Sequence, residues 1–413
     1  MPQAAPSATP KSPDVAADAL FDALKRGDFR AAESSFDERL RTGLPEEKLR
    51  EVWGGIRSQL GALQAWDVTE RAQRNGNDVR TARLSFERGE VEALVASHSD
   101  SGEVASLFFK PLSAPKPAAP YVDPTAFHAE EVSVGSEPFV LSATLTVPAG
   151  AGPFPGVVLV HGSGPSDRNE AVGGNQPFRN LAEGLSSRGV AVLRYDKRTF
   201  RYREQIADGD ISIDNEVIID AIAAVQELKR HSEVDKARVF VIGHSLGAQL
   251  APEIALRSAP IAGVVLLAPP GRPPLDALAA QLRFLGAAPE KIAEIEEASA
   301  LLKAGKLGER KLLGVPGSYW ADWASRDGVA MAQKLRKPSL VLRGDRDYQV
   351  IDDDIEAWRR GLRGQKGVEF VTLEGDNHLF IRGTGKPNPA EYQTPGFVDE
   401  RVIDLVAQFV TKR

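Results

Sequence analysis

The spacing of hydrophobic positions changes along the chain and predicts two domains. Over residues 13–60 apolar side chains recur with the 3.6-residue period of amphipathic helices, as in DVAADALFDALKRG. Over residues 79–110 they alternate with polar side chains between glycine-containing turns, which is typical of an antiparallel meander. Helices followed by paired strands predict a small α+β domain over residues 12–110.

Two segments outside this domain have a different composition. Residues 1–11 are biased to Ala, Pro, Ser and Thr and predict a disordered lead without the apolar core of a signal peptide. Residues 111–126 contain PLSAPKPAAPYVDP, whose proline density predicts an extended, semi-rigid linker. The domain boundary is therefore expected in residues 111–126.

Residues 127–413 predict an α/β domain. A hairpin pattern, EEVSVGSEPFVLSATLTVP, is followed by continuous apolar runs such as VVLV, VAVL, VFVIG, VVLLA and LVLRG. Such runs are expected of strands buried on both faces, and helical stretches separate them. The alternation predicts a mostly parallel sheet with helices on both faces.

One segment interrupts this alternation. Residues 271–334 lie between two predicted strands and carry helical patterns, LDALAAQLRFLG and EKIAEIEEASALLKAG. The segment is too long for a simple connection and too apolar to be disordered. We predict a helical lid inserted at the carboxyl edge of the sheet.

Composition narrows the classes of function. Of 413 residues, 42% are hydrophobic and 26% are charged, the net charge is −6, and cysteine is absent. A chain without a basic patch argues against a nucleic-acid partner, and no apolar run is long enough to span a bilayer. Without cysteine there are no disulfides, thiolate metal sites or cysteine nucleophiles. No metal and no other cofactor is expected. The sequence is compatible with the cytoplasm, with export after removal of a signal peptide, and with a homo-oligomer.

The motif Gly-His-Ser-Leu-Gly places Ser245 between a predicted strand and a predicted helix. This strand–turn–helix context is the one in which Gly-x-Ser-x-Gly forms a nucleophile elbow. The flanking glycines permit a sharp bend, and the helix N-terminus favours developing negative charge. Ser245 is the predicted nucleophile, the alternative being a glycine turn with no chemical role.

A serine nucleophile needs a base, and the chain has six histidines. Five lie in the small domain, before the sheet, at a helix end, beside the serine and in a glycine-rich loop: His98, His128, His231, His244 and His161. The sixth, His378, follows the last predicted strand, at the edge where the active site of an α/β sheet is expected. His378 is the predicted base.

The acid that orients this base is expected after the preceding strand, in VLRGDRDYQV. Asp345 directly follows a glycine and has the position of a turn residue. Asp347 lies further out and is the predicted acid, although the spacing leaves Asp345 as an alternative. The order Ser, Asp, His along the chain is the one expected of α/β-hydrolases.

Developing negative charge on the substrate needs two preorganised N–H donors. The amide after the nucleophile, that of Leu246, is one candidate. The second is expected in HGSGPSDRNE, after the first central strand, with the amide of Ser163 as the best candidate.

The stretches FPGVVLVHGSGPSDRNE, VFVIGHSLGAQLAP, LRGDRDYQV and GDNHLF together resemble bacterial serine α/β-hydrolases of the carboxylesterase or dienelactone-hydrolase-like type. The resemblance covers nearly all of residues 127–413, and residues 12–110 resemble the small NTF2-like domain that often precedes them. It implies ester hydrolysis through an acyl-enzyme, with Ser245, Asp347 and His378 as the triad. True dienelactone hydrolases place a cysteine at the elbow, so that name indicates the fold and not the substrate.

Three further groups of residues have two interpretations each. Tyr319, Trp320 and Trp323 of the predicted lid either line an acyl pocket or dock the lid on the core. The cations of RYDKR, namely Arg194, Lys197 and Arg198, either contact an acidic substrate or pair with carboxylates, which is the commoner role. Aspartates 352–354 are best explained as the acidic first turn of a helix.

The function predicted from the sequence is that of a serine carboxylesterase for short-chain or aromatic esters, with a small-molecule ester as partner. An aminopeptidase-like serine hydrolase is the alternative within enzymes, and it requires an acidic anchor for the substrate amine. A catalytically idle hydrolase scaffold used for binding is the alternative outside enzymes. The complete set Ser245, Asp347, His378 and HGSG argues against that scaffold.

Overall fold

The computed structural model describes residues 13–412 apart from residues 75, 113–116, 204 and 207–210. The chain divides into two compact units, Met1–Pro117 and Ala118–Arg413. The predicted disordered lead and part of the predicted linker lie outside the described residues. Residues 118–126 of that linker belong to the second unit, in which Ala119 is buried.

In its described residues, the first unit has four helices and a four-stranded antiparallel sheet in the order β1-β2-β3-β4. Its elements are α1 (Pro13–Arg26), α2 (Phe29–Ser34), α3 (Glu38–Gly43), α4 (Glu46–Leu60), β1 (Leu63–Arg74), β2 (Asn77–Phe86), β3 (Gly89–His98) and β4 (Val104–Leu112). The core lies between the helices and the sheet, where Trp53 is fully buried against Phe86 and Phe109.

Helices and a meander were predicted for this unit, but strand β1 was missed. It is an edge strand of mostly polar sequence, LQAWDVTERAQR, and side chains such as Asp67 and Glu70 are exposed. An edge strand has a neighbour on one side only and can be polar on much of its surface. The alternation of apolar and polar side chains along its sequence is therefore weak.

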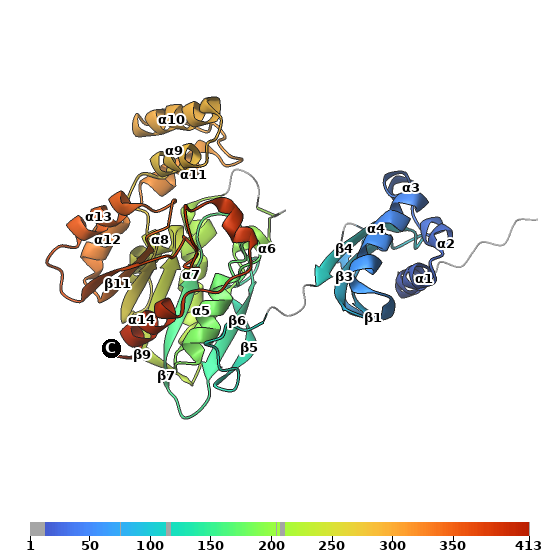
Figure 1. Ribbon diagram of the computed structural model, residues 1–413, viewed down its shortest axis with the longest axis horizontal. Coiled ribbons are helices and arrows are strands. Elements are labelled where there is room, and N and C mark those ends of the chain that lie inside the picture. The colour runs from blue at the N-terminus through green and yellow to red at the C-terminus, as the bar shows by residue number, and fades with distance from the viewer. Residues whose placement is uncertain (1–12, 75, 113–116, 204, 207–210, 413) are drawn as a thin grey trace, which may run out of the picture. The chain divides into compact units, whose positions relative to one another are not determined.

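The second unit is built on an eight-stranded sheet in the order β12-β11-β10-β9-β7-β8-β6-β5 (Figure 1). The strands from β8 to β12 are parallel to β7, whereas β6 is antiparallel to both of its neighbours. The strands are β5 (Phe127–Val134), β6 (Leu141–Pro148), β7 (Phe154–Val160), β8 (Ala191–Tyr195), β9 (Val234–His244), β10 (Gly263–Leu267), β11 (Ser339–Gly344) and β12 (Val368–Leu373). The predicted hairpin and mostly parallel sheet are confirmed.

Helices cover both faces of this sheet. Helix α5 packs against α14, and α7, α8, α12 and α13 form a second packed series. The helices are α5 (Pro177–Ser186), α6 (Arg198–Arg201), α7 (Ile219–Leu228), α8 (Leu246–Arg257), α9 (Pro274–Phe284), α10 (Pro289–Lys303), α11 (Gly317–Ala324), α12 (Gly328–Leu335), α13 (Asp352–Gly361) and α14 (Glu400–Thr411). A π-helical turn, η1 (Asp214–Ile218), precedes α7, and a 3-10 turn, η2 (Pro389–Gln393), precedes α14. Among the described residues, no helix has the length and apolar character needed to cross a membrane.

The segment predicted as a lid, residues 271–334, contains four helices between β10 and β11. Figure 1 shows α9, α10 and α11 together beyond one end of the sheet. Helix α12 packs instead on α8 and α13, within the layer that covers the sheet.

The turn from β9 into α8 requires glycine on both sides of Ser245. A Cβ atom on Gly243 would lie 2.1 Å from the carbonyl oxygen of Gly247. A Cβ atom on Gly247 would lie 2.3 Å from the carbonyl oxygen of Val160 in β7. Helix α8 therefore begins in backbone-to-backbone contact with the neighbouring strand, which no larger residue permits.

We expect Gly247→Ala to destabilise the protein by about 1–3 kcal/mol or more, because the added methyl group has only backbone to displace. Chemical unfolding compares it with Gly164→Ala, where the space around the added Cβ is open and only the positive φ of 83° opposes the change. Equal stability of Gly247→Ala and the wild type would contradict the close contact.

Candidate active site

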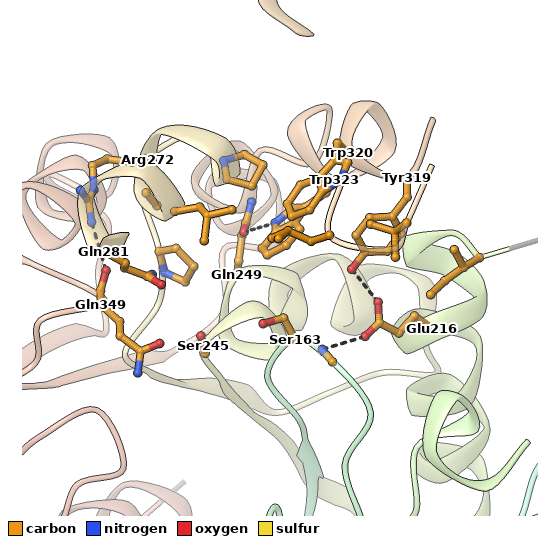
Figure 2. Close-up of a pocket in the computed structure, with 18 of the residues that line it drawn as sticks. Ser163, Glu216, Ser245, Gln249, Arg272, Gln281, Tyr319, Trp320, Trp323 and Gln349 are labelled. Atoms are coloured by element: carbon orange, nitrogen blue, oxygen red, sulfur yellow. Dashed lines mark hydrogen bonds between the residues drawn. The ribbon is translucent and has the colours of Figure 1, made fainter. Parts of the chain in front are cut away.

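A cavity of about 360 Å³ lies where helices α8, α9 and α11 meet the loops that follow β7 and β11 (Figure 2). Ser163 and Ser245 line it on the side of the sheet. Tyr319, Trp320 and Trp323 line it on the side of α11. The structure thus brings the predicted nucleophile, the predicted oxyanion loop and the predicted pocket residues to one cavity.

Ser245 has a strained backbone, with φ of 53° and ψ of −118°. A non-glycine residue with positive φ is costly and is retained where the surrounding structure determines it. The amide of Ser245 donates to the carbonyl of Leu267 in β10, at 2.9 Å, and its carbonyl accepts from the amides of Ala248 and Gln249. The elbow is therefore held from a neighbouring strand and from the first turn of α8.

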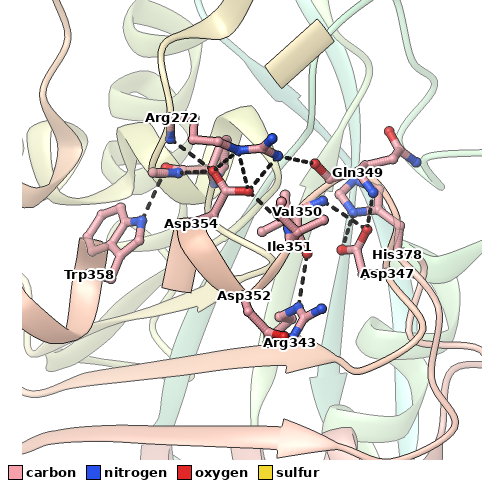
Figure 3. Close-up of polar contacts among 12 residues, drawn as sticks. Arg272, Arg343, Asp347, Gln349, Val350, Ile351, Asp352, Asp354, Trp358 and His378 are labelled. Atoms are coloured by element: carbon pink, nitrogen blue, oxygen red, sulfur yellow. Dashed lines mark hydrogen bonds and ion pairs between the residues drawn. The ribbon is translucent and has the colours of Figure 1, made fainter. Parts of the chain in front are cut away.

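His378 and Asp347 form the hydrogen bond expected of a base and its orienting acid. Nδ1 of His378 lies 2.6 Å from Oδ2 of Asp347, and both side chains are buried (Figure 3). The other carboxylate oxygen of Asp347 accepts from the amides of Gln349, at 2.8 Å, and Val350, at 3.0 Å. With both oxygens engaged, the carboxylate has a fixed orientation.

Two arginines hold the loop that carries Asp347 (Figure 3). Arg343 donates from Nε to the carbonyl of Val350, at 2.9 Å. Arg272 donates from Nη2 to the carbonyl of Gln349, at 3.1 Å, and its guanidinium pairs with the fully buried Asp354. Arg343 also pairs with Asp352, so the acidic first turn of α13 contributes two aspartates, Asp352 and Asp354, to the anchoring of this loop.

Asp345, the alternative acid, has a different partner. Its Oδ1 accepts from the amide of Gly375 at 2.8 Å, which links the end of β11 to the end of β12. The geometry gives it the turn position foreseen for it.

His244 adjoins Ser245, but both of its ring nitrogens are engaged elsewhere. Nε2 lies 2.9 Å from the carbonyl oxygen of His378, and Nδ1 lies 3.0 Å from Oε2 of Glu170. Burial by itself would lower the pKa of His244, but the Glu170 carboxylate outweighs burial and raises it. Burial likewise would raise the pKa of Glu170, and His244 outweighs it, so that the pKa is lowered. Each partner therefore favours the charged form of the other, directly behind the predicted triad.

Two buried carboxylates hold the loop that carries Ser163. The amide of Gly162 donates to Oε1 of Glu170 at 2.7 Å, and the amide of Gly164 donates to Oε1 of Glu216 at 3.2 Å. Within the part of the chain that the structure describes, no acceptor lies against the amides of Ser163 or Leu246. Of the three successive loop amides of Gly162, Ser163 and Gly164, that of Ser163 is thus the one without an acceptor among the described residues.

The other histidine of this loop, His161, has a structural position. Its Nε2 lies 3.0 Å from the carbonyl oxygen of Asp167, and its ring packs against Phe178 and Tyr195. Burial lowers the pKa of His161 to about 4, so the ring is neutral near pH 7. His161 therefore braces the loop.

The three cations at the end of β8 and just beyond it are bound within the protein. Lys197 pairs with Glu216 at 2.6 Å, and Arg198 pairs with Asp220. Arg194 donates to the side chain of Asn169. Lys197 and Arg198 thus pair with carboxylates, as one of the two interpretations predicted, whereas Arg194 binds an amide oxygen.

The aromatic side chains of α11 both line the cavity and attach the helix to the core. Trp323 donates from Nε1 to Oε1 of Gln249 in α8, at 2.9 Å, and stacks on Trp320. The hydroxyl of Tyr319 donates to Oε2 of Glu216, at 2.6 Å. The two interpretations of this cluster are therefore not exclusive.

Sequence reasoning missed four residues that shape the site: Glu170, Glu216, Gln249 and Arg272. Glu170 lies in the quoted stretch HGSGPSDRNE, but nothing in a single sequence marks an acid as buried. Gln249 lies four residues after Ser245, one helical turn into α8, which is a spacing that identifies a neighbour of the elbow.

Among residues that the structure describes, no group of three or more His, Asp or Glu side chains is arranged to hold a metal ion.

Comparison with known proteins assigns a family to this arrangement. Residues 157–391 match the model of the alpha/beta hydrolase family. The chain is 39% identical over 394 residues to Esterase EstD of Thermotoga maritima, an alignment covering 94% of this chain and 93% of that protein.

Two solved structures are similar to part of this chain at low sequence identity. The esterase PF2001 of Pyrococcus furiosus is 19% identical, with a TM-score of 0.45, over 70% of this chain and 92% of that chain. Est1E of Butyrivibrio proteoclasticus is 20% identical, with a TM-score of 0.46, over 68% of this chain and 96% of that chain. On the family match and the near-complete alignment with its relative, this chain belongs to the alpha/beta hydrolase family.

Proposed function

We propose that the protein is a serine carboxylesterase that hydrolyses short-chain or aromatic carboxylic esters through an acyl-enzyme. The observation that carries the proposal is the hydrogen bond between His378 and Asp347, made by loops at the same sheet edge as the strained Ser245. The 39% identity to a protein named as an esterase supports the same reaction.

In the first half of the proposed reaction, Nε2 of His378 removes the proton of the Ser245 hydroxyl as its oxygen attacks the ester carbonyl. Asp347 accepts the hydrogen bond from Nδ1–H, which keeps Nε2 unprotonated beforehand and stabilises the imidazolium that forms. The substrate oxygen becomes negative and accepts hydrogen bonds from the amides of Ser163 and Leu246. His378 then protonates the departing alcohol, and the acyl group stays on Ser245.

The second half repeats these steps with water. His378 removes a proton from the water molecule as its oxygen attacks the acyl carbonyl, and the same two amides bind the oxyanion. The proton returns to the oxygen of Ser245 as the bond to the acyl group breaks. The products are a carboxylic acid and the original enzyme.

Charge in the cavity supports an uncharged substrate. Among the described lining residues, Glu216 is the one with a carboxylate and Arg272 is the one with a cationic side chain. The first is neutralised by Lys197 and the second by Asp354. An aminopeptidase needs an unpaired carboxylate for the substrate amine, and Glu216 does not supply one.

The size of the cavity supports a small acyl group. Ligand pockets range from about 300 to 1,000 Å³, and this cavity, at about 360 Å³, lies at the small end. Its aromatic wall suits apolar or aromatic acyl groups.

We expect hydrolysis of nitrophenyl esters to peak at acyl chains of about two to six carbons, because a cavity at the small end of the range cannot enclose a long chain. Aminoacyl anilides should be poor substrates. Ser245→Ala should lose both this activity and labelling by a fluorophosphonate, whereas Ser58→Ala in the first unit should keep both. Undiminished labelling of Ser245→Ala would place the nucleophile elsewhere, and preferred turnover of anilides would favour a peptidase.

The acid is tested by two matched variants. Asp347→Asn should lower kcat by up to about four orders of magnitude, since an amide favours the wrong tautomer of His378. Asp345→Asn should cost far less, because the side-chain oxygen of asparagine can still accept from the amide of Gly375. Steady-state kinetics on one short ester measures both, and the reverse ranking would assign the acid to Asp345.

The buried pair of Glu170 and His244 predicts a pH-dependent stability. Because the pKa of His244 is raised in the folded protein, the pair stabilises the fold in full below pH about 6.5, the pKa of histidine in the unfolded chain. This stabilisation is lost as pH rises through the pKa of His244 in the folded protein. Because the pKa of Glu170 is lowered in the folded protein, its stabilisation of the fold is complete above pH about 4.3, the pKa of glutamate in the unfolded chain. It is lost as pH falls through the pKa of Glu170 in the folded protein. Glu170→Gln should therefore cost more stability at pH 5.5 than at pH 9.

Urea unfolding at the two pH values measures this difference. The control is Glu130→Gln, which removes one partner of His231 in a more exposed pair and should have a small effect at both values. A cost of Glu170→Gln that is the same at pH 5.5 and pH 9 would show that His244 is not charged in the folded protein.

A further inference from the structure

Glu216 connects the cavity wall to the oxyanion loop through three donors (Figure 2). Its Oε1 accepts from the amide of Gly164, at 3.2 Å, and from Nζ of Lys197, at 2.6 Å. Its Oε2 accepts from the hydroxyl of Tyr319, at 2.6 Å. Lys197 also donates to the carbonyl of Gly162, at 2.8 Å, so the loop is bound on both sides of Ser163.

The position of Glu216 is set by an unusual turn. It lies in η1, where the chain forms a π-helical turn before α7, and π-helical turns occur often at functional sites. The residue is 3% exposed. Burial raises the pKa of Glu216, but Lys197 outweighs it and the net pKa is lowered, so the side chain is an acceptor for all three donors. The phenol pKa of Tyr319 is raised, so its hydroxyl keeps the proton that it donates.

Tyr319 belongs to α11, and this helix is attached to the core at two further points. The carboxylate of Asp322 accepts from the amide of Ile213, which precedes η1, at 2.8 Å. Trp323 donates to Gln249, one turn beyond Ser245. The helix that forms the cavity wall is thus attached to the core through three side chains, those of Tyr319, Asp322 and Trp323.

The geometry points to Glu216 and Tyr319 as positioning residues: through Glu216, the cavity wall of α11 fixes the amide of Gly164 and thereby aims the free N–H of Ser163 at the substrate oxyanion. This inference rests on the proposed ester hydrolysis. Neither residue takes part in bond making. A substrate that displaces α11 would loosen the oxyanion loop, so filling of the acyl cavity and stabilisation of the transition state are coupled.

Such a role predicts a change in kcat rather than in substrate binding. An oxyanion donor acts on charge that develops only in the transition state, and its complete removal costs about 100–1,000-fold in kcat. Loss of the Tyr319 hydroxyl leaves the Ser163 amide present but less firmly held. We therefore expect Tyr319→Phe to lower kcat about tenfold, with KM changed by less than about twofold.

The experiment compares Tyr319→Phe with Tyr202→Phe. Tyr202 donates from its hydroxyl to a backbone carbonyl, that of Val140, at 2.6 Å, and lies outside the cavity lining. Each variant is assayed on a short nitrophenyl ester and titrated with two inhibitors. The serine oxygen adds to the carbonyl of a trifluoromethyl ketone, which converts the ketone oxygen to an oxyanion. The matching secondary alcohol occupies the same space but forms no oxyanion.

Tyr319→Phe should weaken binding of the ketone by about the same factor as it lowers kcat. The alcohol should bind to this variant as tightly as it binds to the wild type. Tyr202→Phe should match the wild type in all three measurements. Glu216→Gln, which also leaves Lys197 without its counter-charge, should show a larger loss in the same direction. If this variant does not fold, Tyr319→Phe alone decides the question.

Two results overturn the inference. If Tyr319→Phe binds the ketone and the alcohol more weakly by the same factor, Tyr319 serves only as part of the cavity wall. Unchanged kcat and ketone affinity in Tyr319→Phe would show that the hydroxyl does not position the loop. A wild type that hydrolyses no ester would instead overturn the proposed function, on which the inference rests.

Discussion

The amides of Gly162 and Gly164 are held by two buried carboxylates, Glu170 and Glu216, and the rest of the site depends on this arrangement. Two N–H groups of a tight loop are occupied, so the one between them, on Ser163, is the donor left for a ligand. Preorganisation of this kind removes the cost of orienting the donor during the reaction. The loop does not have to find its conformation when the substrate arrives.

Each carboxylate in turn requires a buried cation, because an unpaired charge in the interior is costly. Glu170 has His244, and Glu216 has Lys197. The first cation also reaches the carbonyl of His378, and the second reaches the carbonyl of Gly162. The ion pairs therefore connect the proposed base, the elbow and the oxyanion loop into one network. The members of such a network are energetically coupled.

The elbow adds a steric constraint to this electrostatic one. Ser245 keeps a positive φ because β10 binds its amide and α8 begins against β7. The cavity wall on the opposite side is anchored as well, since Tyr319 and Trp323 of α11 both hydrogen-bond to core side chains. Rigid contacts on both sides of the cavity suit a small, uncharged substrate, and they explain why the lid residues cannot be assigned to packing or to binding alone.

The sequence by itself determined the α/β fold of the second unit and the candidates for chemistry. Continuous apolar runs mark strands buried on both faces, and the Gly-His-Ser-Leu-Gly turn is a local feature that four neighbouring residues define. Asp347 and His378 were predictable because the carboxyl ends of parallel strands meet at one sheet edge, whatever the intervening sequence. These inferences need only local pattern and the rules of sheet topology.

Only the tertiary structure decided which polar groups are buried and with whom they pair. Glu170 with His244, Glu216 with Tyr319 and Arg272 with Asp354 are separated by between 74 and 103 residues along the chain. Nothing local distinguishes these acids from solvated ones, because burial is a property of the assembled fold. The same holds for the polar edge strand β1 and for α12, whose role in the sheet-covering layer is set by packing on α8 and α13 and not by its own pattern.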